Sequence, residues 1–230
     1  MKKIVVLTGA GVSAESGIAT FRDSNGLWEN HRVEDVASPE GFARNPELVL
    51  NFYNARRAQL KTVKPNLGHH LIAELEKDYD VTVVTQNVDD LHERAGSSNI
   101  IHLHGELRKV RSVDGFEDPI PWTEDLHLGD LNDEGRQLRP HIVWFGEQVP
   151  RMDMAADVVS RADLIIIVGT SMQVYPAAGL VSYAPPHIPV IYIDPNPTIN
   201  DALARRDITT IVKGGGEGMA EAVELIPGLL

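Results

Sequence analysis

A histidine at the end of an apolar run is the residue of this sequence best suited to acid–base chemistry. The run 99–104, NIIHLH, ends at His104, which is followed by Gly105. Imidazole titrates near neutral pH, so His104 is a candidate general base. Two further histidines, His92 and His102, are weaker candidates, because a histidine beside a strand is most often a structural polar residue. We therefore expect only His104 to act as a base.

Further polar groups come directly after other apolar runs. The run 81–85 is followed by the amides of Gln86 and Asn87 and by the carboxylate of Asp89. Open α/β sheets bind ligands in the crevice outside the carboxyl ends of their strands. At the end of the run 164–170 and directly after it, Gly169, Thr170 and Ser171 are well placed to contact a ribose, and the run 189–194 ends in Asp194. Together these clusters predict one ligand-binding crevice.

The first apolar run leads into a glycine turn. The segment GAGVSA fits the pattern G-x-G-x-x-A at Gly9, Gly11 and Ala14. Such a turn lets backbone N–H groups approach a pyrophosphate at the N-terminus of a helix. The dinucleotide fingerprint also requires an acid at the end of the second strand, and here Glu34 and Asp35 fall in no expected strand. A tight turn without a ligand therefore remains an alternative.

A second loop feature points to the same kind of ligand. Arg22 and Asp23 lie between Gly17 and Gly26, which indicates a mobile flap over phosphates. The planar fork of Arg22 could pair with a pyrophosphate through two hydrogen bonds. The alternative is a surface Arg–Asp pair of little energetic value.

The elements that must position these residues alternate along the chain. Continuous apolar runs are typical of strands buried on both faces, and hence of a parallel sheet covered by helices. One helical segment opens with Asn45 as its N-cap and Pro46 at its first position. The alternation predicts an α/β fold with a Rossmann-like, doubly wound parallel sheet. The expected strands are 4–8, 81–85, 99–104, 141–145, 164–170, 189–194 and 208–212, and the expected helices are 45–60, 66–77, 152–162 and 218–226.

One segment breaks this alternation. Residues 108–136 have few apolar positions, many acidic residues and two prolines, which indicates a surface excursion or a small lobe. The sequence contains no internal repeat. We expect a single domain over 1–230 with a small-lobe insertion at 108–136.

Composition restricts the function further. The chain has 230 residues, and its formal charge of −12 disfavours binding to nucleic acid or to an anionic membrane. It contains no cysteine, which excludes disulfides, thiolate zinc sites and cysteine nucleophiles. The apolar run near the N-terminus is too short for a signal peptide, and no other run is long enough to span a bilayer. We therefore expect a cytoplasmic protein.

Five segments, taken in order, resemble the sirtuins, a family of NAD-dependent protein lysine deacylases. They are GAGVSAESGI…FRDSNGLW, TQNVDDLHERAG, HLHGEL, LRPHIVWFGE and GTSMQVYPAA, and the resemblance covers nearly the whole chain. It implies a Rossmann-like domain that binds NAD, a small zinc-binding lobe, and an acyl-lysine protein or peptide that enters between them. We expect the protein to be a monomer.

The resemblance also assigns roles to individual residues. His104 would be the catalytic base that removes a proton from a ribose hydroxyl. Val143, Phe145 and Gly146 would offer their backbone to an extended substrate peptide. NAD would be bound by Gly9, Ala10, Gly11, Ser13, Phe21, Arg22, Trp28, Gln86, Asn87, Asp89, Gly169, Thr170, Ser171, Asp194, Asn196 and Gly216.

The implied reaction gives free lysine, nicotinamide and O-acyl-ADP-ribose. Its oxocarbenium-like transition state requires a shielded site with oriented polar groups. Two alternatives remain open. The same crevice could support NAD glycohydrolase or ADP-ribosyltransferase activity, or the chain could be a non-catalytic, NAD-responsive binding module. Retention of His104, Asn87 and Asp89 speaks against the binding module.

The sequence departs from the sirtuin pattern at three places. Ala19 stands where the family has a proline, and Asp194 stands where it has an asparagine. The third departure is the loss of all four zinc cysteines, because 108–136 offers only carboxylates and His127 in their place. We predict that no metal is bound, and that a small apolar core replaces the zinc, formed by Phe116, Ile120, Trp122, Leu126 and Leu131.

The segment FYNARR bears on the acyl group. Tyr53 and Arg56 are three residues apart in an expected helix, so they share one face. Sirtuins that remove succinyl and malonyl groups have Tyr-x-x-Arg at the matching helix, where both side chains bind the acyl carboxylate. The resemblance thus implies removal of succinyl, malonyl and acetyl groups. We expect Phe52 to pack inward and Arg57 to point to solvent or to an acidic neighbour.

Overall fold

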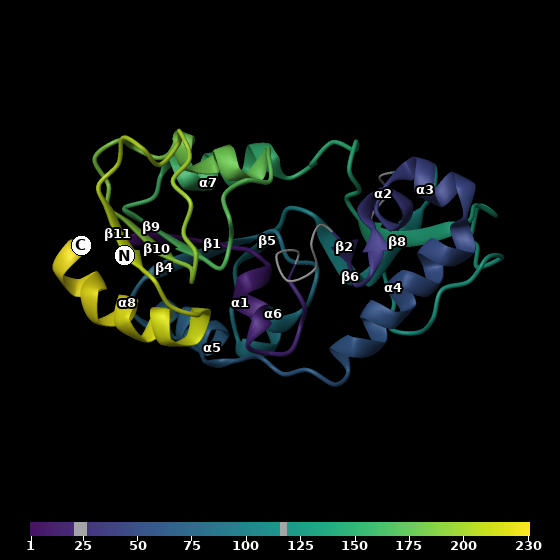
Figure 1. Cartoon of the computed structure of the whole chain (residues 1–230), viewed down its shortest axis with the longest axis horizontal. Helices are drawn as coiled ribbons and strands as arrows, with labels where there is room; N and C mark the ends of the chain where they lie inside the picture. The colour runs from purple at the N-terminus through teal and green to yellow at the C-terminus, as the bar shows by residue number, and fades with distance from the viewer. Residues whose placement is uncertain (21–26, 116–118) are drawn as a thin grey trace.

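A six-stranded parallel sheet forms the centre of the molecule (Figure 1). The structure is a computed structural model that describes residues 1–20, 27–115 and 119–230. The strand order is β11-β10-β9-β1-β4-β5, so the first strand lies in the middle of the sheet and the chain adds strands first on one side of it and then on the other. The switch point falls between β1 and β9. The strands are β1 (Lys3–Thr8), β4 (Asp80–Thr85), β5 (Ile100–His102), β9 (Leu164–Val168), β10 (Val190–Ile193) and β11 (Ile208–Ile211).

Helices cover both faces of this sheet. Ile4 and Val6 of β1 face one hydrophobic core, and Val5 and Leu7 face the other. Every residue of β9 is fully buried, as expected for a strand covered on both sides. The prediction of a doubly wound parallel sheet is therefore confirmed. The first core is covered by α5 (Leu67–Glu74) and α8 (Gly215–Leu229), and the second by α7 (Met152–Ser160) and the 3-10 helix η3 (Ala177–Tyr183); η2 (Leu75–Lys77) follows α5.

Two short helices lie near the carboxyl ends of the central strands. They are α1 (Ala10–Ala14), which follows β1, and α6 (Leu91–Ala95), which follows β4. Among the described residues, no helix combines the length and apolarity needed to cross a membrane.

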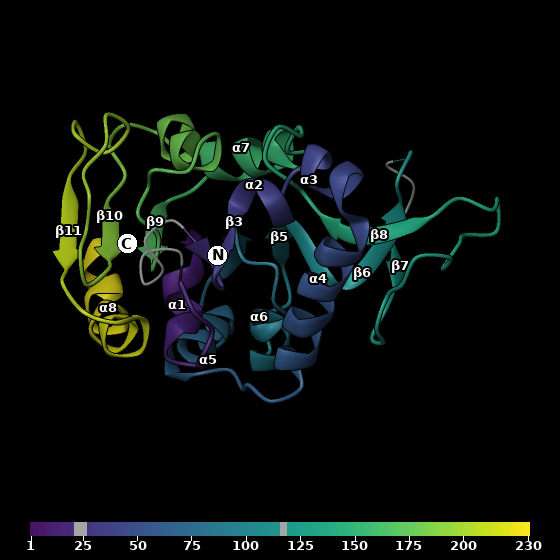
Figure 2. The same ribbon diagram turned by 45° about the vertical axis from the view of Figure 1, so that its right-hand side comes forward.

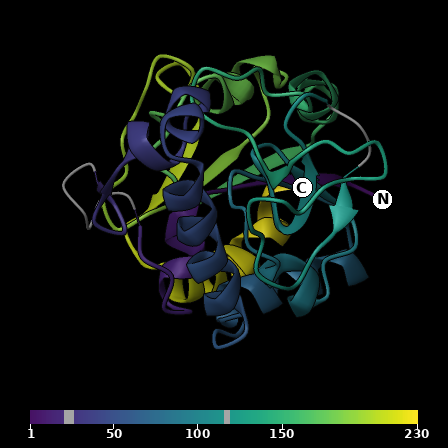
Figure 3. The same ribbon diagram turned by 90° about the vertical axis from the view of Figure 1, so that its right-hand side faces the viewer.

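A smaller lobe extends from one end of the sheet (Figure 2). It contains the three-stranded antiparallel sheet β7-β6-β8 and a group of helices that precede it in sequence. Viewed from that end, α4 lies beside the antiparallel sheet and packs against β6 and β8 (Figure 3). The elements are β2 (Leu27–Trp28), β3 (His31–Arg32), α2 (Val33–Val36), α3 (Pro39–Arg44), α4 (Pro46–Leu60), β6 (Gly105–Ser112), β7 (Ile120–Pro121) and β8 (Leu138–Ile142).

Helix α4 begins as its sequence predicts. The side chain of Asn45 accepts a hydrogen bond from the backbone N–H of Leu48 at 3.1 Å, and Pro46 occupies the first helical position. Phe52 is buried in the core of the smaller lobe, which confirms its predicted inward packing.

The expected strand 141–145 is wrong in its extent and in its sheet. The strand β8 ends at Ile142 and pairs antiparallel with β6. The apolar run reads like a central strand because Ile142 and Trp144, at and after the end of β8, are buried in the core of the smaller lobe instead. An apolar run alone does not specify which sheet a strand joins.

The apolar core that replaces the zinc module is smaller than predicted and differs in membership. Ile120 and Leu131 are 44% and 52% exposed, so they contribute no buried core. Leu126 is fully buried, as predicted, and Trp122 packs partly buried beside it. The partners of Leu126 come from elsewhere: Leu50 of α4, Val110 of β6 and Leu138 of β8. Phe116 lies outside the described residues.

Candidate active site

The turns that follow β1 and β9 pack directly on each other at the switch point. The backbone N–H of Gly11 donates to the carbonyl oxygen of Gly169 at 2.8 Å, and that of Gly9 donates to Val168 at 3.1 Å. A Cβ atom on Gly11 would lie 2.7 Å from the Cα of Gly169. Close backbone packing is enough to require glycine here. The glycine pattern therefore does not by itself indicate a ligand, whereas the polar groups around the turn do.

A chain of buried hydrogen bonds joins this turn to the residues after β4. The Nδ2 of Asn87 donates to the carbonyl oxygen of Gly9 and to the Oγ of Ser13, both at 3.1 Å. The hydroxyl of Ser13 donates in turn to Oδ2 of Asp89 at 2.9 Å. Burial raises the pKa of Asp89, and hydrogen bonds from Leu91 and Ser13 offset part of that effect. Asn87, Ser13 and Asp89 are thus one connected unit.

The residues after β9 and β10 lie at the same edge. Gln86 donates through Nε2 to the Oγ1 of Thr170 at 3.1 Å, and the hydroxyl of Tyr192 donates to the backbone carbonyl of Thr170 at 2.8 Å. Asp194 is buried after β10 and accepts a hydrogen bond from the backbone N–H of Asn196 at 2.7 Å. Ser171 follows Thr170 and is partly exposed. The structure therefore brings together the polar clusters that the sequence placed after separate strands.

His104 lies between β5 and β6, where the chain leaves the parallel sheet. The next residue, Gly105, has φ +87°, and a Cβ atom there would lie 2.0 Å from the carbonyl oxygen of His141. Only glycine fits this turn. The Nδ1 of His104 lies 3.1 Å from the carbonyl oxygen of Gln86, which can only accept, so Nδ1 carries the proton and Nε2 has the lone pair. Burial lowers the pKa of His104, so the ring is a neutral base near pH 7.

The two other histidines have partners of their own. Nε2 of His92 lies 3.0 Å from the Oγ1 of Thr8 in the sheet interior, and burial lowers the pKa of His92 well below its usual value. His102 has Oε1 of Glu93 2.6 Å from its Nε2 and the carbonyl oxygen of Asn87 3.2 Å from its Nδ1. Neither ring is placed with its nitrogens open to the crevice.

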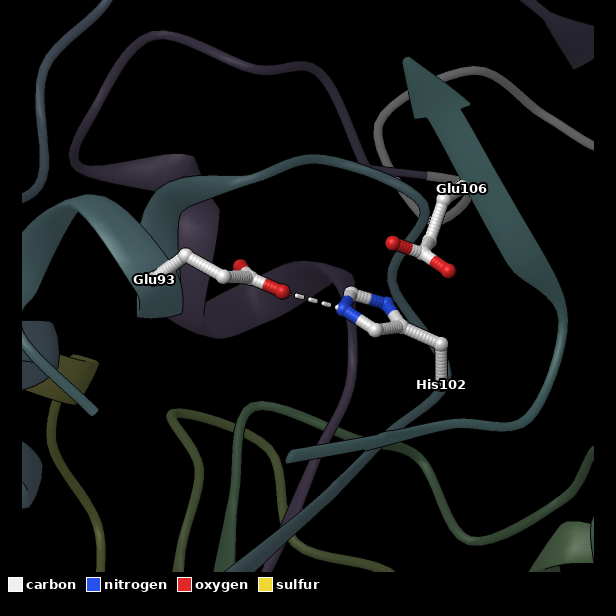
Figure 4. A group of neighbouring side chains, drawn as sticks. All are labelled: Glu93, His102 and Glu106. Atoms are coloured by element: carbon white, nitrogen blue, oxygen red, sulfur yellow. Dashed lines mark hydrogen bonds and ion pairs between the residues drawn. The ribbon is translucent and has the colours of Figure 1, made fainter. Parts of the chain in front are cut away.

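His102 also belongs to a group with metal-ligand chemistry (Figure 4). Ligand atoms of Glu93, His102 and Glu106 lie within 4.8 Å of one another, and no other such group of three occurs in the part of the chain that the structure describes. Both ring nitrogens of His102 already have partners, and Glu106 pairs with Lys109 at 3.0 Å. The group is therefore an ion-pair cluster rather than an open metal site.

Tyr53 and Arg56 lie on one face of α4, as their spacing predicts. Tyr53 is fully buried, and its hydroxyl oxygen accepts a hydrogen bond from Nε1 of Trp144 at 3.0 Å. Burial raises the pKa of Tyr53, so the phenol stays protonated. The side chain of Arg56 is 18% exposed, and its guanidinium lies 3.9 Å from Glu29. Its Nε is buried and has no hydrogen-bond partner among the described residues.

The expectation that Arg57 points to solvent is wrong, although the acidic Asp125 lies near enough to act on its charge. The residue is only 2% exposed, and its side chain points into the smaller lobe rather than to solvent. Nε of Arg57 donates to the carbonyl oxygen of Leu107, and Nη1 donates to Oδ1 of Asn54, both at 2.9 Å. Arg57 points in a different direction around the helix axis from Arg56, and β6 lies on that side of α4. The sequence alone did not show that β6 lies beside α4.

The predicted peptide-binding segment has its N–H groups occupied. The N–H of Val143 donates to the carbonyl oxygen of His104, and that of Phe145 donates to Ala37, both at 2.9 Å. Gly146 follows with φ +90°, and the ring of Phe145 is 54% exposed. A peptide that pairs with Val143 or Phe145 must therefore use their carbonyl oxygens.

The other residues assigned to the cofactor have varied positions. Trp28 makes edge contacts with the rings of Phe52 and Tyr53, at centroid distances of 4.9 and 5.9 Å. The N–H of Gly216, in the first turn of α8, donates to Oε1 of Glu15 at 3.1 Å and is therefore already used. Ala10 begins α1, where no acidic residue would oppose an anion. Phe21 and Arg22, and with them the predicted flap, lie outside the described residues.

Sequence reasoning missed the ion pair that supports Tyr53. Arg139 donates to Glu147 at 2.7 and 3.1 Å, and its guanidinium lies 3.2 Å from the centroid of the Trp144 ring. Glu147 also accepts from the N–H of Trp144 at 2.8 Å. Glu147, at the end of the WFGE segment, is evident in the sequence. Its pairing with Arg139 could not be predicted, because it depends on how the chain turns between the two residues.

The fold and the site together define a class of protein. A doubly wound parallel sheet, a glycine turn at its switch point and polar residues gathered there are typical of dinucleotide-binding α/β enzymes. The Sir2 family profile matches residues 9–176, and the chain therefore belongs to the Sir2, or sirtuin, family. The prediction of the family is confirmed.

Named relatives agree with this assignment. An NAD-dependent protein deacylase of Bacteroides thetaiotaomicron is 55% identical, over 98% of both chains. One from Helicobacter pylori is 58% identical, over 85% of both chains. A solved Sir2 homologue in complex with ADP-ribose is 41% identical, with a TM-score of 0.87 over 99% of this chain and 92% of its own. The protein is an NAD-dependent protein deacylase.

Proposed function

We propose that this deacylase removes succinyl and malonyl groups from lysine in addition to acetyl groups. The observation that carries the proposal is the half-enclosed guanidinium of Arg56, whose Nε is buried without a partner among the described residues. A buried donor without a partner costs free energy unless a ligand supplies an acceptor. A carboxylate at the end of the acyl chain would be such an acceptor, and it matches the planar fork of arginine.

The orientation of Tyr53 supports the same proposal. The indole nitrogen of Trp144 can only donate, so the hydroxyl oxygen of Tyr53 accepts and its own hydrogen is directed elsewhere. That hydrogen can be donated to an acyl carboxylate beside Arg56. Arg139 and Glu147 hold Trp144 in place, so Tyr53 is positioned by a rigid, buried support.

NAD would be held at the carboxyl edge of the parallel sheet. The residues there fit it chemically: Gln86 and Asn87 supply amides, Thr170 and Ser171 supply hydroxyls, and Asp194 supplies a carboxylate for ribose. Bound NAD supplies the ribose carbon from which nicotinamide departs. His104 accepts a ribose hydroxyl proton at Nε2, the nitrogen that carries the lone pair.

Further parts of the proposal concern partners, location and metal. The substrates are acyl-lysine proteins or peptides, and the negative charge of the protein disfavours nucleic acid and anionic membranes. We further propose a cytoplasmic monomer without structural zinc. In the smaller lobe, the side chain of Asn54 binds both the N–H and the carbonyl oxygen of Leu126, at 2.9 and 3.0 Å, and so holds the segment that lacks cysteines.

The test is a panel of succinyl-, malonyl- and acetyl-lysine peptides assayed with NAD. Arg56→Met should lower kcat/KM for the succinyl and malonyl peptides about tenfold to hundredfold, the factor expected for lost hydrogen bonds to a charged group. The acetyl peptide should be affected little. Lys61→Met, an exposed charge change at the end of the same helix, is the matched control. Equal loss with all three peptides would contradict the proposal.

The same assay separates deacylation from NAD hydrolysis. Deacylation releases one free lysine for each nicotinamide, whereas NAD glycohydrolase activity releases nicotinamide alone. We expect equal amounts of the two products. Nicotinamide without deacylated peptide would contradict the role of the site residues in deacylation.

A further inference from the structure

One ion pair, with a buried histidine and a partly exposed glutamate, lies next to the candidate site but takes no part in the chemistry described above. His102, at the end of β5, is 5% exposed. Its Nε2 lies 2.6 Å from Oε1 of Glu93 on α6 (Figure 4), and its Nδ1 lies 3.2 Å from the backbone carbonyl oxygen of Asn87. The ring therefore bridges a helix and the segment that carries Asn87.

Both nitrogens of His102 act as donors. The carbonyl oxygen of Asn87 can only accept, and an ionised Glu93 can only accept as well. The ring that satisfies both is an imidazolium, which makes the short contact with Glu93 a charge-assisted hydrogen bond. A neutral ring would have one nitrogen without a proton facing an acceptor.

The surrounding charges favour this protonated state. Glu93 and His92 face the ring from α6, Glu106 and Lys109 come from β6, and Asp89 lies on the segment after β4. Burial acts to lower the pKa of His102, but the hydrogen bond and charge of Glu93, with that of Glu106, outweigh it and raise the pKa. Three of the four charged neighbours are acidic, so a positive ring fits the site.

The backbone that His102 holds is connected to the glycine turn. The carbonyl of Asn87 accepts from His102, while its side chain donates to Gly9 and Ser13. The preceding residue, Gln86, holds Nδ1 of His104 in the same way. Two histidines thus fix successive carbonyl groups of one segment, and that segment sets both the candidate base and the turn after β1.

We propose that His102 and Glu93 form a positioning pair, which fixes Asn87 and thereby the NAD site. The inference rests on the proposed role of Asn87 in holding NAD. His102 is a positioning residue rather than a catalytic one, because it acts through the backbone of Asn87. Removing its bond to Asn87 should weaken cofactor binding while leaving the peptide site, on the other lobe, unchanged.

Two substitutions of His102 distinguish its hydrogen bond to the carbonyl oxygen of Asn87 from its hydrogen bond to Glu93. The amide nitrogen of asparagine reaches about as far as Nδ1, and that of glutamine reaches about as far as Nε2. His102→Asn thus keeps a donor for Asn87, and His102→Gln keeps one for Glu93. We expect His102→Gln to weaken ADP-ribose binding in calorimetry about tenfold, which corresponds to roughly 1.4 kcal/mol, with an equal rise in KM for NAD. His102→Asn should restore most of the affinity, and KM for the peptide should not change.

Two controls keep the result interpretable. Glu76→Ala removes the carboxylate that accepts from the N–H and the hydroxyl of Ser98, just after α6, at 2.8 and 2.6 Å, and should leave ADP-ribose affinity unchanged. Asn87→Ala tests the assignment on which the inference rests. If Asn87→Ala binds ADP-ribose normally, the role of Asn87 is wrong; if it weakens binding and His102→Gln does not, only the positioning pair is wrong.

Two further outcomes would overturn the proposal. An equal rise in both KM values, accompanied by a loss of stability, would show a general structural defect instead of positioning. Tight binding of Zn²⁺ by the wild-type protein that is lost in Glu106→Gln would make the group a metal site. The imidazole signals of His102 in ¹⁵N spectra of the wild-type protein can be identified because they are missing from the spectra of His102→Gln. Near neutral pH these signals should show a proton on both ring nitrogens.

Discussion

His104 donates through Nδ1 to the carbonyl oxygen of Gln86, and burial lowers its pKa below the usual value. The two observations are linked. The fixed hydrogen bond determines which nitrogen holds the lone pair, and the lowered pKa keeps that lone pair free of a proton at neutral pH. The ring is therefore prepared to accept a proton before any substrate arrives.

The pH dependence of kcat/KM should reflect this lowered pKa. A base with a lowered pKa works at any pH above that pKa, so activity should fall only as the pH drops through it. We expect the acidic limb of kcat/KM to have its midpoint below the usual histidine value of about 6.5. His104→Asn should lower kcat by roughly 10²–10⁴-fold and remove this limb. A midpoint above that usual value would contradict the assignment.

Glu29 lies 3.9 Å from Arg56 and, if Arg56 binds an acyl carboxylate as proposed, would compete with it. Both side chains are mostly enclosed, at 24% and 18% exposed, so the pair is only partly screened by solvent. Glu29→Gln should raise kcat/KM for the succinyl peptide about threefold to tenfold relative to the acetyl peptide, the scale of a modest ion pair. An unchanged ratio, measured with both peptides, would show that Glu29 does not tune acyl preference.

At the scale of elements, α4 serves several purposes at once. One face carries Tyr53 and Arg56, the residues proposed to bind the acyl carboxylate. Another carries Asn54 and Arg57, which hold the backbone of Leu126 and Leu107 in the smaller lobe. Leu50 completes the small core around Leu126. This helix therefore links acyl recognition to the stability of the segment that has lost its cysteines.

Removing the Asn54 side chain should destabilise the smaller lobe. Asn54→Ala leaves the buried N–H and carbonyl oxygen of Leu126 and one donor of Arg57 without their partner. We expect a loss of about 2–4 kcal/mol in the free energy of unfolding by urea. Asn51→Ala, at an exposed position of the same helix, is the matched control. Equal stability of the two variants would contradict this role.

The metal content of the protein tests the proposal that the smaller lobe contains no structural zinc. We expect purified protein to contain no stoichiometric zinc, and EDTA to leave its urea midpoint unchanged. A structural zinc site would contribute folding free energy, so its removal would lower the midpoint. Stoichiometric zinc by metal analysis would contradict the proposal for the smaller lobe.

At the scale of the whole molecule, the parallel sheet could be predicted from the sequence because each of its strands is a continuous apolar run. Runs such as LIIIV are buried on both faces wherever they occur in a doubly wound sheet. The polar clusters after β1, β4, β9 and β10 meet because the carboxyl ends of parallel strands share one edge. Fold and candidate site were therefore predictable together.

The smaller lobe was harder to predict, because its contacts join distant segments. Arg57 is buried only because β6 lies beside α4, and Leu126 finds its partners on α4, β6 and β8. The apolar run 141–145 reads like a central strand, but β8 ends inside it at Ile142 and pairs antiparallel in another sheet. Periodicity within one segment does not contain this information. The bridge from Glu93 through His102 to Asn87 is likewise visible only in three dimensions.

The most direct measurement of acyl-carboxylate recognition uses two peptides of nearly equal shape. One carries succinyl-lysine, and the other carries its neutral amide analogue, succinamoyl-lysine. Wild-type protein should prefer the succinyl peptide in kcat/KM, and Arg56→Met should lose that preference by about tenfold to hundredfold. If the ratio of the two peptides is the same in the wild type and in Arg56→Met, the guanidinium does not bind the acyl carboxylate.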